Sequence, residues 1–110
     1  MKQEILTAID DFIDENSEQI FHNISRLVAV NSIEEAPQEN APFGPGPKKA
    51  LDEALAISAE LGLGTRNCEY KIGYAFIGGE GDRYLATITH VDVVPARSTS
   101  WNQDCREKYQ

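Results

Sequence analysis

Basic residues are scarce in this chain. Ten lysines and arginines stand against 18 aspartates and glutamates, which gives a formal net charge of −8. Nucleic-acid phosphates and anionic membrane surfaces both attract lysine and arginine, so this balance argues against nucleic acid and membrane as partners. No apolar run reaches the length of a membrane span, and no signal-peptide core follows the first residues.

Cysteine is also rare, with only Cys68 and Cys105 in the chain. They lie far apart and without the spacing of a metal-binding motif, so a disulfide framework is excluded and the reducing cytoplasm is the expected location. Cys68 falls in a predicted strand, where we expect a small, buried or half-buried residue. The 110 residues, 41% hydrophobic and 25% charged, have the composition of one ordinary globular domain.

Two amphipathic helices are predicted within the first 30 residues. Apolar residues recur at helical spacing in both, first at Ile5, Ile9, Phe12 and Ile13 and then at Ile20, Phe21, Ile24, Leu27 and Val28. Asn16 is predicted to cap the second helix, with Gln19 reaching back to it, so a break or bend is expected near Asn16. His22 lies beside the apolar stripe and is predicted to be solvated or at the boundary of the core.

A loop over residues 31–47 is predicted from its four prolines and its glycines at 44 and 46. Pro47 suits the first turn of a third helix, which Gly62 and Gly64 would end. Its predicted buried face consists of Leu51, Ala54, Leu55, Ser58 and Leu61. Residues 43–47 read Phe-Gly-Pro-Gly-Pro, and the prolines remove backbone donors that a phosphate cradle would need, so we interpret them as the helix entry.

The remainder is predicted to form strands. Residues 66–70 and 73–77 can pair around a turn near Lys71, and a second, glycine-rich turn at 78–82 leads into a strand at 84–91. That last strand has apolar residues on both faces, which is typical of a strand interior to a sheet. The predicted class is therefore α/β, with three helices, a hairpin and a strand of a larger mixed sheet.

His90 and Asp92 stand at the end of this predicted strand. Residues two apart on an extended chain point to the same side, so the imidazole and the carboxylate are expected to lie together. A neutral imidazole can bind a metal through one nitrogen while a nearby carboxylate orients the ring. Pro95 then ends the run. The pair predicts part of a metal site at a strand end, where parallel sheets often place ligands.

The sequence around this pair resembles that of a known family. Residues 89–95 read Thr-His-Val-Asp-Val-Val-Pro, which resembles the metal-binding segment of the aminoacylase/carboxypeptidase family of dinuclear zinc peptidases. The Phe-Gly-Pro-Gly-Pro entry to a helix, Gly-Tyr-Ala at 73–75 and the glycine-rich turn occur in the same order and are most similar to the bacterial dipeptidase branch, which includes Xaa-His dipeptidases. The resemblance covers roughly residues 1 to 104.

The resemblance implies roles for two residues. His90 matches the family histidine that binds one of two zinc ions, with Mn²⁺ or Co²⁺ as possible substitutes. Asp92 matches the catalytic aspartate that supports that histidine without binding the metal itself. The implied activity is hydrolysis of a dipeptide by metal-activated water. The other metal ligands and the general base of the family lie beyond this segment, so residues 1–110 are expected to be the incomplete N-terminal portion of a metallopeptidase catalytic domain, inactive alone.

The sequence departs from the family pattern in three places. Thr89 stands where glycine is usual, and residues 97–100 precede Trp101 without the usual glycine. After Asp104 the chain lacks the expected proline and aromatic residue. The tail is therefore interpreted as a truncated or frame-shifted product.

Two other interpretations remain at this point. A small non-catalytic domain could retain only the start of the fold and bind a partner, including a second copy of itself, through an exposed sheet edge. Alternatively, the chain could be a plain globular domain in which His90 is buried and structural.

Overall fold

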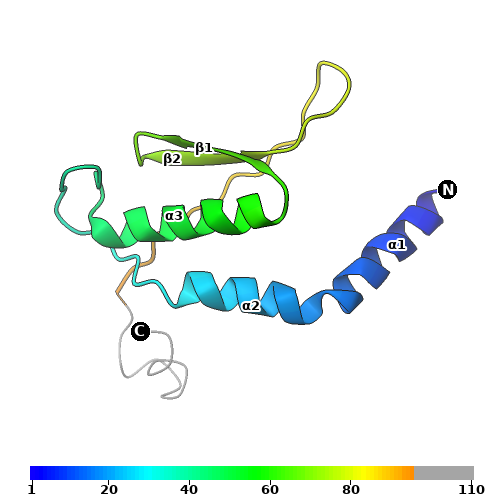
Figure 1. The fold of residues 1–110 in the computed structure, drawn as a ribbon, viewed down its shortest axis with the longest axis horizontal. Helices are drawn as coiled ribbons and strands as arrows, with labels where there is room; N and C mark the ends of the chain where they lie inside the picture. The colour runs from blue at the N-terminus through cyan, green and yellow to red at the C-terminus, as the bar shows by residue number, and fades with distance from the viewer. Residues whose placement is uncertain (96–110) are drawn as a thin grey trace.

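The computed structural model describes residues 1–95 and has a mixed α/β architecture. Three helices are followed by two strands: α1 (Lys2–Glu15), α2 (Ser17–Val28), α3 (Pro45–Glu60), β1 (Gly64–Cys68) and β2 (Ile72–Phe76). Figure 1 shows α3 between the β1–β2 hairpin on one side and α2 on the other, with α1 extending away from them. The predicted α/β class is confirmed. Within residues 1–95, no helix combines the length and the apolar character that crossing a membrane requires.

The break between α1 and α2 lies at Asn16, as predicted, but its capping role is different. The Asn16 side chain forms no cap hydrogen bond with α2. Its Nδ2 instead donates to the Phe12 carbonyl oxygen at 2.8 Å, and Gln19 Nε2 donates to Asn23 Oδ1 at 3.1 Å. The predicted capping box is wrong because the Asn16 side chain turns back to α1, where it is a second donor to the Phe12 carbonyl oxygen that also accepts the Asn16 backbone N–H at 3.0 Å.

Helix α3 begins at Pro45, so Pro47 lies in its first turn as predicted, while the loop predicted over residues 31–47 ends earlier than expected. Gly44 is its N-cap residue and has φ +96°, a conformation that side chains disfavour. Pro45 and Pro47 lie in the first turn. Backbone N–H groups in a first turn have no acceptor within the helix, so a proline there costs no helical hydrogen bond. Residues 43–47 thus form the helix entry, as we interpreted them.

The buried face of α3 differs in part from the prediction. Ile57 is 8% exposed and Ala50 is 2% exposed, and neither was on the predicted face. Leu61, which was on it, is 64% exposed because the helix ends at Glu60 and the chain turns at Gly62, with φ +88°. A prediction made from helical spacing continues past the true end of the helix and therefore assigns Leu61 wrongly.

The predicted hairpin is confirmed, with its strands shifted by one or two residues. Strands β1 and β2 pair antiparallel with Cys68 opposite Ile72, and the Lys71 N–H donates to the Cys68 carbonyl oxygen at 3.1 Å across the turn. The hairpin packs on α3 at Gly73, where an added Cβ would lie 2.6 Å from Leu51 Cδ1. Cys68 is half-buried, as predicted.

The predicted strand at 84–91 is not present as a strand. These residues form no ladder with any described residue, and Tyr84, Leu85 and Ile88 are 96%, 96% and 98% exposed. A strand needs a neighbour to accept and donate its backbone hydrogen bonds. Apolar residues on both faces predict an interior strand only where a sheet and its covering layers exist, and residues 1–95 supply neither at this position.

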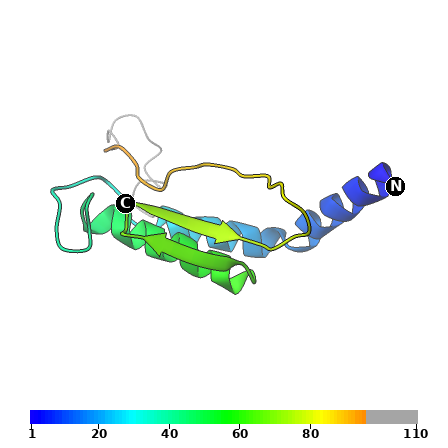
Figure 2. The same cartoon turned by 90° about the horizontal axis from the view of Figure 1, so that it is seen from above.

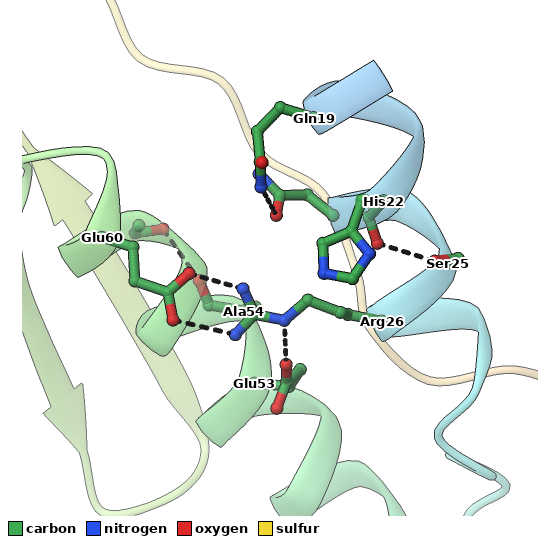
Figure 3. A network of polar contacts seen from close by, with 9 residues as sticks. Gln19, His22, Ser25, Arg26, Glu53, Ala54 and Glu60 are labelled. Carbon is green, nitrogen blue, oxygen red and sulfur yellow. Dashed lines mark hydrogen bonds and ion pairs between the residues drawn. The ribbon is translucent and has the colours of Figure 1, made fainter. Parts of the chain in front are cut away.

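An ion cluster joins α2 to α3 (Figure 3). Arg26 Nε contacts Glu53 Oε1 at 2.6 Å, and its Nη1 and Nη2 contact the two Glu60 oxygens at 2.5 and 3.1 Å. Two carboxylates raise the pKa of the Arg26 guanidinium, and its hydrogen bonds lower the pKa of Glu60. The guanidinium fork binds one carboxylate through two bonds and the other through a third. It thereby fixes how the two helices are rotated against each other.

Replacing Glu60 with glutamine tests this cluster through pH. Folding lowers the pKa of Glu60, so its ionised form contributes stability above the ordinary glutamate pKa, and this is lost as pH falls through the lowered value. We expect the Tm of the wild type to fall more steeply than that of Glu60→Gln between about pH 5 and about pH 3. Thermal unfolding followed by circular dichroism measures both slopes.

The matched control is Glu34→Gln, at an exposed glutamate that forms no ion pair within residues 1–95. It should keep the wild-type slope. Identical slopes in the wild type and in Glu60→Gln would show that the cluster contributes nothing to acid sensitivity.

Candidate metal-binding site

The segment after β2 carries the predicted site residues. From residue 77 to residue 92 it has no helix or strand, and in Figure 2 it turns back from the end of β2 and runs toward the N-terminal end of α3. There the Val93 N–H donates to the Ser32 carbonyl oxygen at 3.3 Å, and Val93 forms an isolated parallel bridge with Ile33. Two parts of the sequence 60 residues apart are thus brought side by side next to His90 and Asp92.

His90 and Asp92 lie together on the same side of the chain. The His90 Nδ1 atom is 3.0 Å from Asp92 Oδ1 and 2.9 Å from the Asp92 carbonyl oxygen. Both partners are acceptors, so a neutral ring in this geometry carries its proton on Nδ1 and keeps a lone pair on Nε2. The side chains of His90 and Asp92 are 81% and 53% exposed. The exposed His90 side chain contradicts the alternative interpretation in which His90 is buried and structural.

The pair fits a divalent metal as one ligand with its support. Zinc binds neutral imidazole nitrogen at about 2.0–2.1 Å, and a metal-binding histidine usually donates its other N–H to a carboxylate or a carbonyl oxygen. His90 has both kinds of acceptor at Nδ1. Within residues 1–95, however, no cluster of three or more histidine, cysteine, aspartate or glutamate residues could hold a metal ion. Within residues 1–95 the His90–Asp92 pair therefore stands without further candidate ligands, and its role in metal binding stays a prediction.

The other candidate residues lie apart from this pair. His22 is exposed on α2 beside Arg26 in Figure 3, which confirms its prediction as a solvated or boundary residue. Cys68 lies on β1. Cys105 and Trp101, and the interpreted tail, lie outside the described residues.

A shallow hollow between residues 38–42 and the hairpin turn includes neither site residue. It is lined by Gln38, Asn40, Ala41, Pro42, Glu69, Tyr70 and Lys71. Beside this hollow, the Lys48 Nζ atom lies 4.7 Å from the centre of the Tyr70 ring. This cation–π contact helps to hold the turn between β1 and β2 against α3. The proposed chemistry does not involve this hollow.

Comparison with known proteins points to peptidases. No protein-family model matches the chain. The sequence is 33% identical over 96 residues to a Staphylococcus saprophyticus protein named "Putative dipeptidase", covering 86% of this chain and 20% of that protein. It is 35% identical over 86 residues to a Staphylococcus aureus protein of the same description, covering 76% and 18%. The chain spans about a fifth of the length of these relatives, and the similarity supports a dipeptidase-like protein.

Replacing Asp92 with alanine tests the geometry of the pair. In the wild type the acceptors at Nδ1 should hold neutral His90 in the tautomer protonated at Nδ1. In Asp92→Ala only the carbonyl oxygen remains, so we expect the population protonated at Nε2 to rise. Nitrogen-15 NMR of the imidazole rings measures both populations.

The second histidine provides the internal control. His22 is distant in sequence, and its tautomers should be the same in the wild type and in the variant. Predominant protonation of wild-type His90 at Nε2 would contradict the geometry described here.

Proposed function

We propose that this chain is the N-terminal portion of the catalytic domain of a zinc-dependent dipeptidase, with His90 as a zinc ligand and Asp92 as its catalytic support. One observation carries the proposal: an exposed imidazole is hydrogen-bonded to a carboxylate, with Nε2 left available, in a chain similar to proteins named as dipeptidases. The substrate class is dipeptides, including Xaa-His dipeptides. The complete site holds two zinc ions, which Mn²⁺ or Co²⁺ can replace.

Asp92 acts on the ring in two ways. Its carboxylate and carbonyl oxygens fix the rotation of the imidazole, and they keep the proton on Nδ1. The negative charge also increases the basicity of Nε2 and therefore its strength as a ligand. A bound metal would supply Lewis acidity for a peptide carbonyl and lower the pKa of a bound water.

One imidazole does not make a catalytic site. A catalytic zinc ion normally takes three protein ligands, and residues 1–95 offer one supported histidine. The proposal therefore assigns the remaining ligands and the general base to parts of the protein outside these residues. It follows that the 110-residue chain alone should bind zinc weakly and hydrolyse no dipeptide.

A chimera tests the proposed function directly. This chain would replace the matching segment of the Staphylococcus saprophyticus relative, which is first assayed itself with Zn²⁺, Mn²⁺ or Co²⁺ on Xaa-His dipeptides. We expect the chimera to hydrolyse dipeptides, and His90→Ala to lower kcat/KM by more than about 100-fold because it removes a metal ligand. Asp92→Ala should lower kcat/KM by about 10- to 100-fold, as loss of a ligand's carboxylate partner does.

The matched control is His22→Ala, which removes the other imidazole of the chain and should change kcat/KM by less than about twofold. Full activity of the His90→Ala chimera would exclude His90 as a ligand. An inactive relative would remove the dipeptidase assignment, and turnover by the isolated chain would contradict the incomplete site.

A second candidate function is a non-catalytic binding module that pairs with a second copy of itself. The observation favouring it is the segment at 84–91, where Tyr84, Leu85 and Ile88 are almost fully exposed and backbone groups lack partners among residues 1–95. Unpaired extended backbone with apolar side chains is a template for pairing with another chain.

Sedimentation equilibrium of the purified chain tests this module. Self-pairing predicts a dimer that strengthens with added salt, because the two copies each carry a net charge of −8 that salt screens. Ile88→Lys should weaken the dimer, because it places a charge on the pairing segment, whereas the same change at exposed Leu61 should not. A monomer at all concentrations removes the basis for this candidate.

A further inference from the structure

Gly46 lies where the first turn of α3 meets the loop that follows α2. A Cβ added at Gly46 would lie 3.2 Å from Ser32 Cα and closer still to the Asn31 carbonyl oxygen, nearer than real Cβ atoms approach such an oxygen. The obstructing atoms are backbone, so no side-chain rotation relieves the clash. Gly46 has no left-handed φ, so the requirement for glycine here is one of space alone.

The backbone that Gly46 contacts is the same backbone that holds the site segment. Ser32 is 3% exposed, and its carbonyl oxygen accepts the hydrogen bond from the Val93 N–H at 3.3 Å. Within residues 1–95, this hydrogen bond belongs to the Ile33–Val93 bridge that joins residues 77–95 to the loop after α2. Val93 directly follows Asp92 and lies three residues after His90.

We propose that Gly46 is a positioning residue for the candidate metal site. By admitting the Asn31–Ser32 backbone against the first turn of α3, it sets the position of the Ser32 carbonyl oxygen, which in turn holds Val93 and the adjacent His90–Asp92 pair against the helices. This inference rests on the proposed function, since it concerns where the His90 ligand is held. It goes beyond that function because Gly46 touches neither the metal ligand nor its support.

The local pair and its placement are separable. The contact between His90 and Asp92 is made within three consecutive residues and does not need Gly46. The placement of the pair relative to α2 and α3 depends on Ser32 and Val93. Three extended residues span at most about 10 Å, so a metal ion on His90 lies near the backbone of residues 31–33 only while Val93 is held.

The test uses the full 110-residue chain, with Mn²⁺ alone as a paramagnetic probe, in wild type, Gly46→Ala and a matched control. Mn²⁺ bound at His90 should broaden the His90 ring signals and the amide signals of residues 31–33 in the wild type. In Gly46→Ala we expect the His90 broadening to persist and the broadening at 31–33 to fall by at least about half. Hydrogen exchange at the Val93 amide should become at least about tenfold faster.

The control is Gly78→Ala, because an added Cβ at Gly78 meets no atom within 4 Å and its φ is not left-handed. It should match the wild type in every measurement. Amide exchange in α3 reports the overall fold of each variant. Alanine in a helix is ordinarily more stabilising than glycine, so loosening at Val93 would be opposite to the effect of helix propensity.

Val93→Pro serves as a second variant if Gly46→Ala fails to fold, because proline removes the donated N–H without altering α3. It should abolish the broadening at 31–33 and leave that at His90. Broadening at 31–33 that persists in Gly46→Ala or, failing that variant, in Val93→Pro overturns the positioning role. No broadening at His90 in any variant overturns the proposed function instead.

Discussion

The close approach of the first turn of α3 to the Asn31–Ser32 backbone is the contact on which the arrangement of this molecule depends. It fixes the loop after α2 against the helix, and the Ser32 carbonyl oxygen then holds Val93. Gly44 contributes at the same place through its left-handed φ and its contact with Glu35. The Arg26 cluster joins the last turn of α2 to Glu53 and Glu60 on α3. Together these contacts connect the helices to the segment that carries His90 and Asp92.

Much of the fold could be predicted from local patterns. Helical spacing, the break at Asn16 and the turn between β1 and β2 are encoded by neighbouring residues, and the structure agrees on each. One prediction that failed needed knowledge of distant neighbours, and others failed at helix ends. The segment at 84–91 has the residues of an interior strand, but strand formation requires a partner. The side chain of Asn16 lies between the end of α1 and the start of α2. Sequence spacing predicted that it caps α2, whereas it bonds to the Phe12 carbonyl oxygen of α1.

The candidate site shows the same division. The two-residue spacing of His90 and Asp92 predicted that their side chains point to the same side of the chain. The His90 Nδ1 atom indeed lies 3.0 Å from Asp92 Oδ1. Their role in metal binding stays a prediction. The contacts from Gly46 through Ser32 to Val93 join three separate parts of the sequence, so no local sequence pattern could predict them. The same holds for Arg26, whose partners are 27 and 34 residues away.

The central claim is that His90 binds a divalent metal through Nε2 while Asp92 holds Nδ1. Anomalous diffraction from crystals of the chain soaked in Zn²⁺ tests it most directly, because the signal identifies the element and its position. The account predicts a zinc peak about 2.0–2.1 Å from His90 Nε2, with Asp92 still bonded to Nδ1. A zinc ion on Nδ1 that displaces Asp92, or zinc at His22 with none at His90, would contradict it.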